Sequence, residues 1–198
     1  MAIDPNKVTD FNRDDSALQE FFIYCVAVAG RQAKTVSRQV GEMLALLRGD
    51  HPDFALLSPF ALLNLLHTQE GIAAALKKVG VGCYNQKAEA ICRAAGQWVA
   101  DLLDLATCTV EQLETIRWAG PKTVRFFLLH SRPNQRLAAL DTHILKHLAA
   151  HGVPVPLNPP GKGPAYLRLE REFLKLADAA GMTPADYDLH VWKQYANA

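Results

Sequence analysis

The spacing of the apolar residues constrains the fold of this chain more than any other feature. Apolar residues recur at intervals of three and four, as Val36, Val40, Met43, Leu44 and Leu47 do, and this is the period of a helix that buries one face. No segment alternates apolar and polar residues in the way that a half-buried strand does. The sequence therefore predicts an all-α protein of about ten short helices.

Capping residues and prolines indicate where these helices begin. Ser58 and Thr183 each offer a hydroxyl directly before a proline, which is favoured at the first position of a helix. The predicted helices cover residues 16–30, 35–47, 59–66, 69–79, 85–105, 110–117, a stretch that begins at 121, and 142–150, 165–180 and 184–195. The first of them is apolar on nearly all sides, which predicts a helix at the centre of the fold.

The composition is that of an ordinary globular protein. Of the 198 residues 49% are apolar and 21% are charged, and the length suits one compact domain or two small lobes. No run of about 18 apolar residues that could span a membrane is present. The N-terminus also lacks the basic-then-apolar pattern of a signal peptide, so we expect a cytoplasmic protein without a membrane partner.

Charge and cysteine usage give weaker indications. The net charge of +1 is small for a protein that binds nucleic acid by neutralising phosphates, although helix N-termini can also hold phosphates. Cys25, Cys83, Cys92 and Cys108 are scattered, with no C-x-x-C pair. We therefore expect reduced thiols in the core and neither a zinc site nor an iron–sulfur cluster.

A lysine and an aspartate stand out in the stretch 113–148, which has the pattern helix, tight turn, helix, loop, helix. Lys122 lies just inside the second helix, after Gly120 and Pro121, and Asp141 lies just before the third. Gly120 is expected to take the positive φ of a tight turn, and Pro121 the first helical position. On these residues alone, Lys122 is a solvated lysine and Asp141 a helix N-cap, but together they could also perform covalent chemistry on a sugar carbon.

Several blocks of the sequence resemble the helix-hairpin-helix DNA glycosylases, the superfamily of endonuclease III and the 8-oxoguanine glycosylases. The resemblance lies in a glutamine–alanine turn, a glycine–tyrosine–asparagine helix start, a hairpin that ends in a lysine and an aspartate-x-histidine signature, at residues 29–36, 82–89, 116–123 and 140–145. It implies a two-lobed helix-hairpin-helix glycosylase fold with a cleft between the lobes. Residues 18–128 would form a helical barrel lobe that ends in the hairpin, and residues 1–17 with 129–198 the second lobe.

The resemblance also implies an activity and a partner. The protein would be a bifunctional DNA glycosylase/AP lyase that acts, as a monomer, on double-stranded DNA containing a damaged base. Lys122 would attack C1′ of the damaged nucleotide as a neutral amine and form a Schiff base, and β-elimination would then nick the strand. Asp141 would stabilise the positive charge that develops on the sugar and help to deprotonate the lysine or a water molecule.

The C-terminal third favours one branch of the superfamily. Endonuclease III ends in four cysteines that hold an iron–sulfur cluster, whereas this chain has no cysteine after Cys108. Residues 166–177 and 184–192 are instead similar to the short 8-oxoguanine glycosylase/lyase of archaea and some bacteria. This similarity implies that Trp192 stacks on the flipped base and that Gln32 fills the space left in the duplex. It implies no cofactor beyond a monovalent cation at the hairpin.

The residues expected to contact DNA lie around the hairpin and on neighbouring helices. They are Trp118, Ala119, Gly120, Lys34, Lys87, Arg125 and His143. The hairpin departs from the family at Trp118, where the family has glycine, and a tryptophan does not easily adopt a conformation reserved for glycine. His143 and His147 have the spacing of a zinc pair but lack a carboxylate partner, so we reject a metal site there.

Three alternatives remain open from the sequence. One is a glycosylase/lyase for oxidised pyrimidines, and another is a non-catalytic helix-hairpin-helix DNA-binding module. A pure binding module needs neither Lys122 nor Asp141, so these two residues favour an enzyme. A helical scaffold for protein–protein contacts is the third and weakest alternative.

Overall fold

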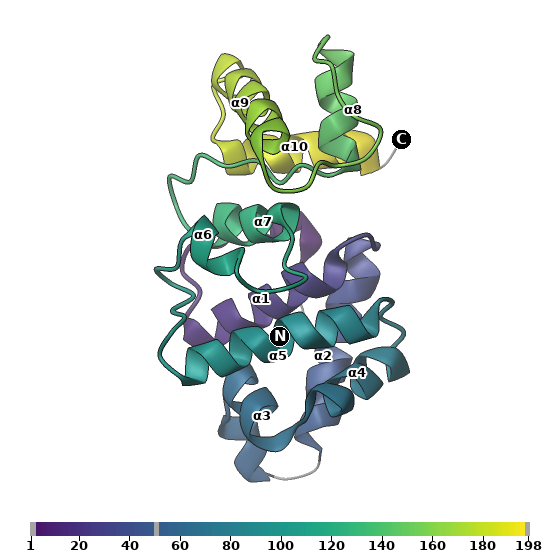
Figure 1. The fold of residues 1–198 in the computed structure, drawn as a ribbon, viewed down its shortest axis with the longest axis vertical. Coiled ribbons are helices and arrows are strands. Elements are labelled where there is room, and N and C mark those ends of the chain that lie inside the picture. The colour runs from purple at the N-terminus through teal and green to yellow at the C-terminus, as the bar shows by residue number, and fades with distance from the viewer. Residues whose placement is uncertain (1–2, 50–51, 197–198) are drawn as a thin grey trace. The chain divides into compact units, whose positions relative to one another are not determined.

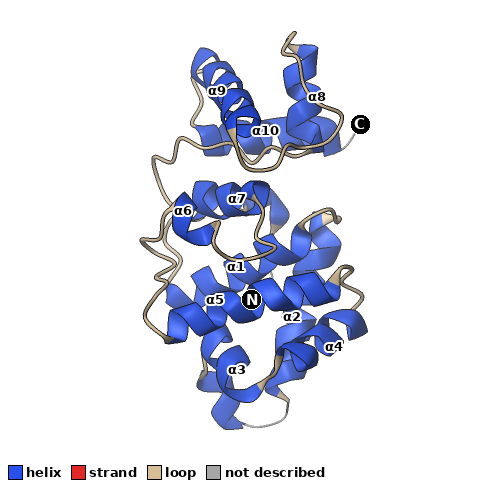
Figure 2. Cartoon of the chain, in the orientation of Figure 1, coloured by secondary structure: helices blue, strands red, loops and turns tan. Residues whose placement is uncertain are grey.

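The computed structural model describes residues 3–49 and 52–196, and every regular element within these ranges is a helix (Figure 1, Figure 2). The elements are η1 (Pro5–Lys7), α1 (Asp15–Val28), α2 (Ala33–Arg48), η2 (Pro52–Leu56), α3 (Pro59–Leu66), α4 (Gln69–Lys78), α5 (Tyr84–Val99), α6 (Val110–Leu113), α7 (Pro121–Ser131), α8 (Thr142–Ala150), α9 (Pro164–Ala179) and α10 (Pro184–Ala196), where η marks a 3-10 helix. The predicted all-α fold is confirmed, and the cleft between two lobes stays a prediction.

The contacts within the chain divide it into two compact units. The first unit comprises Met1–Val8 with Asn12–Ala119, and the second comprises Thr9–Phe11 with Gly120–Ala198. This boundary differs from the predicted one, which placed residues 120–128 with the N-terminal lobe. For residues 120–128 the difference arises because α7, which begins at Pro121, packs against α10 in the second unit. The prediction also placed residues 1–17 with the second lobe, whereas residues 3–8 and 12–17 lie in the first unit, where η1 and α1 contact α2.

Helix α1 is the buried centre of the first unit, as its all-round apolar surface predicts. Every residue from 21 to 28 is buried, and α1 contacts α2, α3 and α5. The buried amide of Gln19 joins two helices, because its Nε2 donates to Asp15 Oδ2 at 2.6 Å and its Oε1 accepts from the backbone N–H of Phe60 at 2.8 Å. This second bond satisfies a donor in the first turn of α3 that has no partner within the helix.

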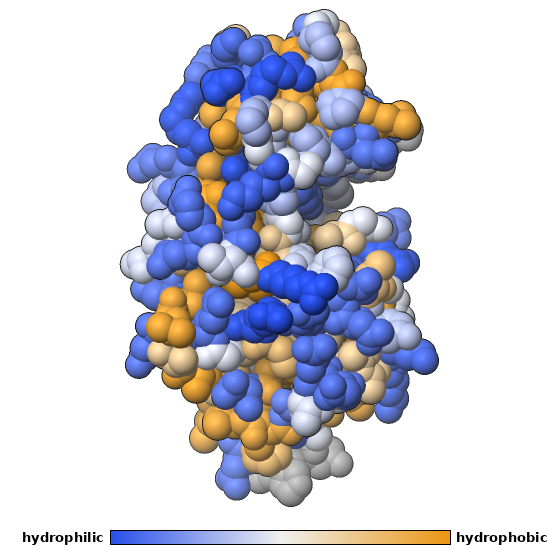
Figure 3. All heavy atoms as spheres, in the orientation of Figure 1, coloured by the Kyte–Doolittle hydropathy of each residue, from blue (hydrophilic) through white to orange (hydrophobic). Residues whose placement is uncertain are grey.

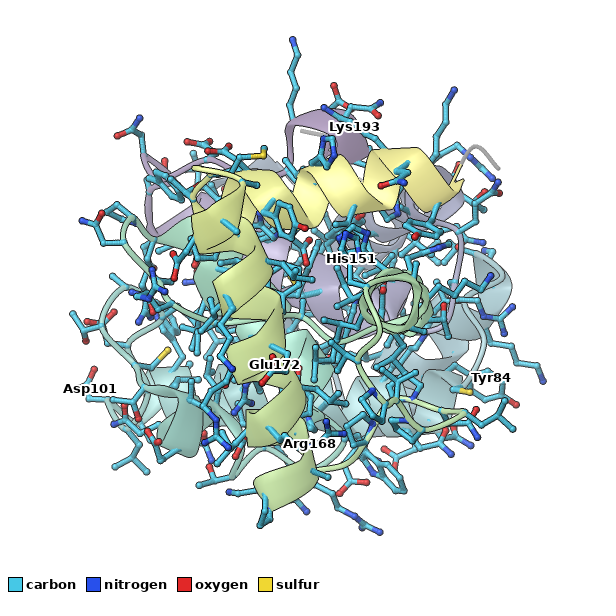
Figure 4. All side chains as sticks on the ribbon, turned by 90° about the horizontal axis from the view of Figure 1, so that it is seen from above. Tyr84, Asp101, His151, Arg168, Glu172 and Lys193 are labelled. Atoms are coloured by element: carbon cyan, nitrogen blue, oxygen red, sulfur yellow. The ribbon has the colours of Figure 1, made fainter. Side chains whose placement is uncertain are left out.

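The core of the second unit is formed by α8, α9 and α10. Its fully buried members include Leu140, Leu148, Leu169, Phe173 and Val191. The loop between α8 and α9 is rich in proline, and the Arg168 guanidinium of α9 donates to the carbonyl of Pro154 in it at 2.8 Å. Figure 4 labels Arg168 near the start of α9. This bond joins the loop to the first half of the helix that follows it.

Apolar side chains also reach the surface of the first unit. Leu56, Leu65 and Leu66 are 91%, 65% and 38% exposed, and apolar atoms gather on the surface over α3 (Figure 3). In the part of the chain that the structure describes, no helix is both long enough and apolar enough to cross a membrane.

Helix α5 ends six residues earlier than predicted, at Val99 rather than Leu105. The end is a Schellman motif, in which Leu102 N donates to Gln97 O at 2.9 Å and Asp101 N donates to Trp98 O at 3.1 Å. The motif requires a left-handed residue, and Asp101 supplies it with φ of 56°. Glycine is the usual residue at this position, so a sequence with aspartate there does not indicate that the helix ends.

We expect Asp101→Gly to raise the free energy of unfolding by about 0.5–1 kcal/mol, because glycine has no Cβ to strain at positive φ. The matched control is Gly181→Ala at the same position of the Schellman motif that ends α9, where φ is 66°. That variant should lose about 1 kcal/mol. Urea denaturation of the three proteins measures both changes, and a destabilised Asp101→Gly variant would contradict this account of the α5 terminus.

Candidate active site

Lys122 lies in the first turn of α7, directly after Pro121. Its side chain is half-buried, and its Nζ lies 4.5 Å from the centroid of the Phe126 ring, one turn further along the helix. This is a cation–π contact, which holds the side chain along α7. Before Lys122 could act as a nucleophile, its proton would have to pass to a nearby base.

The prediction that Gly120 takes a positive φ is wrong. Gly120 is the N-cap of α7 with φ of −69° and ψ of 166°, an extended conformation that any residue adopts. The left-handed residue of the turn is Trp118, with φ of 70°. Gly120 is exposed, and a Cβ placed on it would have no atom within 4 Å. The fold therefore gives no internal reason for glycine at this position.

Asp141 is the N-cap of α8, as predicted. Its Oδ1 accepts from the backbone N–H groups of His143 at 2.8 Å and Ile144 at 2.9 Å. Burial raises the pKa of Asp141 above the usual aspartate range, and the carboxylate of Asp188 acts in the same direction, while the Lys122 ammonium opposes both. The second unit therefore brings Lys122 and Asp141 within electrostatic reach of each other, with Asp141 held rigidly by its cap.

Two of the predicted phosphate contacts are buried and already bonded within the protein. Lys87 Nζ donates to the carbonyls of Ala27 at 2.6 Å and Ala29 at 3.4 Å, where it satisfies groups at the end of α1. Arg125 Nε donates to Glu170 Oε1 at 2.9 Å, and both side chains are less than 10% exposed. Side chains that are this buried and already bonded do not reach a DNA phosphate, so both residues have a structural role in this fold.

The other predicted contacts differ in how open they are. Lys34 is exposed, and Gln32, the exposed N-cap of α2, accepts from Thr35 Oγ1 at 3.0 Å. His143 is half-buried, and its Nδ1 is buried without a hydrogen-bond partner. Ala119 is buried, and its N–H already donates to Ile116 O at 3.0 Å. Trp192 is half-buried on α10, in the same unit as Lys122 and Asp141.

No arrangement for a metal is found in the ranges that the structure describes. Nowhere in residues 3–49 and 52–196 do three or more histidine, cysteine or acidic side chains come together as ligands. All four cysteines are free, but Cys83 is exposed at the N-cap of α5, so the prediction that it lies in the core is wrong.

Comparison with solved structures identifies the fold. No protein-family model matches the sequence. The 8-oxoguanine glycosylase/lyase of Methanocaldococcus jannaschii, solved with a 15mer DNA containing 8-oxoguanine, superposes with a TM-score of 0.71 at 17% identity, over 94% of this chain and 84% of that one. The 8-oxoguanine DNA glycosylase of Thermotoga maritima gives a TM-score of 0.66 at 21% identity, over 92% of this chain and 81% of that one. The chain has the fold of the 8-oxoguanine DNA glycosylases.

Within this glycosylase fold, Trp118 lies at a turn position with φ of 70°, a conformation that is unfavourable for a tryptophan. Its indole Nε1 donates to Glu89 Oε2 at 2.7 Å, and the Arg117 guanidinium lies 4.8 Å from the ring centroid. The hydrogen bond from the indole also lowers the pKa of Glu89. These contacts oppose the strain of a left-handed tryptophan. The sequence does not reveal Glu89 as the partner of Trp118, because the two residues are 29 positions apart and have no local signature.

We expect Trp118→Gly to be more stable to unfolding than Trp118→Ala by about 1 kcal/mol. Both variants lose the indole and its bond to Glu89, so they differ only in the Cβ that alanine must carry at positive φ. Urea denaturation of the two proteins under one set of conditions measures this difference. Equal stability, or a more stable alanine variant, would show that the backbone at 118 leaves the left-handed region when the indole is removed.

Proposed function

We propose that this protein is a bifunctional DNA glycosylase/AP lyase that removes 8-oxoguanine from double-stranded DNA. The observation that carries the proposal is that one compact unit holds Lys122 within electrostatic reach of a partly buried Asp141, whose carboxylate is fixed by its cap bonds. The shared fold supports the choice of substrate, since one solved structure of that fold is a glycosylase/lyase complex with DNA containing 8-oxoguanine.

The base-removal step would use Lys122 as the nucleophile. A bond forms from Lys122 Nζ to C1′ of the damaged nucleotide while the bond from C1′ to the base nitrogen breaks. The base leaves with that electron pair and takes up a proton. An amine attacks only in its neutral form, so the reaction needs a group that accepts a proton from the lysine nitrogen.

Asp141 is suited to accept that proton. A carboxylate whose pKa is raised by burial is a stronger base than a solvated one, and it also stabilises positive charge that develops on the sugar. Its two bonds from backbone N–H groups hold Oδ1 in place, so little reorganisation is needed during the reaction.

The lyase step would follow from the covalent intermediate. Opening of the sugar ring gives a Schiff base between Lys122 and C1′, which makes the C2′ proton acidic. Loss of that proton expels the 3′ phosphate and nicks the strand, and water then hydrolyses the Schiff base to release Lys122. None of these proposed reaction steps uses a metal ion or a redox cofactor.

Single-turnover assays on matched duplexes test the proposal. The duplexes carry 8-oxoguanine opposite cytosine, thymine glycol opposite adenine, or no lesion, in one sequence context. We expect free 8-oxoguanine by chromatography and a nicked strand on a denaturing gel for the first duplex only. Faster release of thymine glycol, or tight binding with no base release from any duplex, would contradict the proposed substrate or the proposed catalysis.

A further inference from the structure

The second unit contains a buried ion pair, and its arginine lies one turn after the proposed nucleophile on α7. Arg125 follows Lys122 on α7, and its Nε donates to Glu170 Oε1 of α9 at 2.9 Å, with side chains 7% and 9% exposed. The same guanidinium lies 4.4 Å from the ring centroid of Tyr166, also on α9. Its Nη1 donates to Pro121 O, next to Lys122, at 3.4 Å. Arg125 thus ties the first turn of α7 to α9.

Glu170 and Tyr166 of α9 also bond to the backbone just before Asp141, the proposed proton acceptor. Glu170 Oε1 also accepts from the backbone N–H of Ala138 at 3.0 Å. The Tyr166 hydroxyl accepts from the backbone N–H of Leu140 at 3.1 Å and donates to Ala138 O at 2.8 Å. Ala138 and Leu140 are fully buried, and Asp141 is the next residue. The backbone that precedes Asp141 is therefore fixed by two side chains of α9.

Burial of an ion pair is a poor way to gain stability, since desolvation offsets much of the attraction. What this pair provides is a fixed connection, because one carboxylate oxygen of Glu170 bonds both to the helix that carries Lys122 and to the segment that carries Asp141. A misplacement of about 1 Å between reacting groups can cost on the order of 10²-fold in rate. Geometry of this kind therefore matters more to catalysis than to folding.

We infer that Arg125, Glu170 and Tyr166 are positioning residues that fix Asp141 relative to Lys122. The inference rests on the proposed function for its catalytic consequence. It also reassigns Arg125 from an expected DNA contact to a residue that acts through the two proposed catalytic groups.

The sharpest test is Tyr166→Phe, which removes one hydroxyl and keeps the ring. We expect the single-turnover rate of 8-oxoguanine release to fall about 10-fold or more, with duplex affinity unchanged. In an Asp141→Asn background the same substitution should change the rate less than about twofold, because a positioning residue has no effect once the group it positions is gone. A rate loss of equal size in both backgrounds would overturn the inference.

The matched control is Asp178→Asn. It breaks the exposed pair from Arg136 to Asp178, with contacts of 3.1 and 2.7 Å, which joins α9 to an earlier part of the same segment. We expect the rate and the affinity of this variant to equal those of the wild type. A loss as large as that of Tyr166→Phe would show that any loosening of the segment has the same effect, which contradicts a specific role for Tyr166.

A measurement without DNA separates this inference from the proposed function. Carbon-detected NMR follows the titration of the Asp141 carboxyl, which senses Lys122, Asp188 and His143. We expect Tyr166→Phe to shift the midpoint and Asp178→Asn to leave it in place. If the wild type cut no duplex but the shift were seen, the positioning would stand and the proposed function would fail. An unshifted midpoint in Tyr166→Phe would refute the positioning whatever the activity.

Discussion

Replacing Lys122 by glutamine should lower the rates of base release and strand cleavage by at least about 10⁴-fold, the scale seen when a covalent nucleophile is removed. Glutamine keeps the length and polarity of the side chain but cannot form a bond to C1′ that leads to a Schiff base. The position is in the first turn of α7 and only half-buried, so we expect the variant to fold normally. Single-turnover assays on the duplex with 8-oxoguanine measure the loss, and circular dichroism checks the fold.

The matched control for this experiment is Lys175→Gln. Lys175 is an exposed lysine of α9 that pairs with Glu172 at 2.8 Å, and Figure 4 labels Glu172 on this helix. An exposed pair of this kind contributes little to stability, so the variant should retain wild-type rates and wild-type folding. Base release by Lys122→Gln at more than about a hundredth of the wild-type rate would contradict the assignment of Lys122 as the nucleophile.

Replacing Asp141 by asparagine should lower the rate of base release by about 10²–10³-fold, because the amide cannot accept the lysine proton and carries no charge to stabilise the sugar. The same change should make the protein more stable near neutral pH. Asparagine caps a helix as well as aspartate does, so the two bonds from His143 and Ile144 can be kept. Urea denaturation and single-turnover assays together measure these opposite effects.

The stability difference between Asp141→Asn and the wild type should depend on pH. Because burial raises the pKa of Asp141 in the folded state, the proton it binds favours folding, and this stability is fully present below the unfolded pKa. It is lost as pH rises through the raised folded pKa. The stability advantage of Asp141→Asn should therefore be present at neutral pH and disappear in acid. This prediction would be contradicted if Asp141→Asn were more stable than the wild type by the same amount at every pH, or were less stable than the wild type at neutral pH.

A further control separates the cap from the charge at this position. Asp141→Ala removes both, so it should lose about 1 kcal/mol of the free energy of unfolding relative to Asp141→Asn at any pH. Equal stability of the alanine and asparagine variants would show that the N-cap bonds contribute nothing to the free energy of unfolding.

Local signals made much of the fold predictable from the sequence. Ser58 with Pro59 and Thr183 with Pro184 mark the starts of α3 and α10. In the structure each hydroxyl accepts a backbone N–H, from Ala61 at 3.4 Å and from Asp186 at 3.2 Å. Asp141 was expected to cap the helix 142–150, and α8 has these bounds. Each of these features depends on residues within one turn of each other, which is why the sequence reveals them.

Features that depend on distant partners were not predictable. Arg125 and Lys87 have the sequence context of surface cations, but their partners Glu170 and Ala27 lie 45 and 60 residues away and bury them. Charged residues are rarely buried unless they are paired, and the sequence does not show which residues pair. The burial of these two side chains was therefore not expected. Trp118 follows the same rule, since only the bond to Glu89 makes its left-handed conformation understandable.

Borohydride trapping tests the central claim most directly. Reduction of a Schiff base during the reaction joins protein and DNA irreversibly, and mass spectrometry of the digested adduct identifies the residue that carries the sugar remnant. We predict an adduct on the duplex with 8-oxoguanine, none on the undamaged duplex, and attachment at Lys122 alone. An adduct at another lysine or at the N-terminal amine, or one that persists in Lys122→Gln, would contradict the account, as would the absence of any adduct with the wild type.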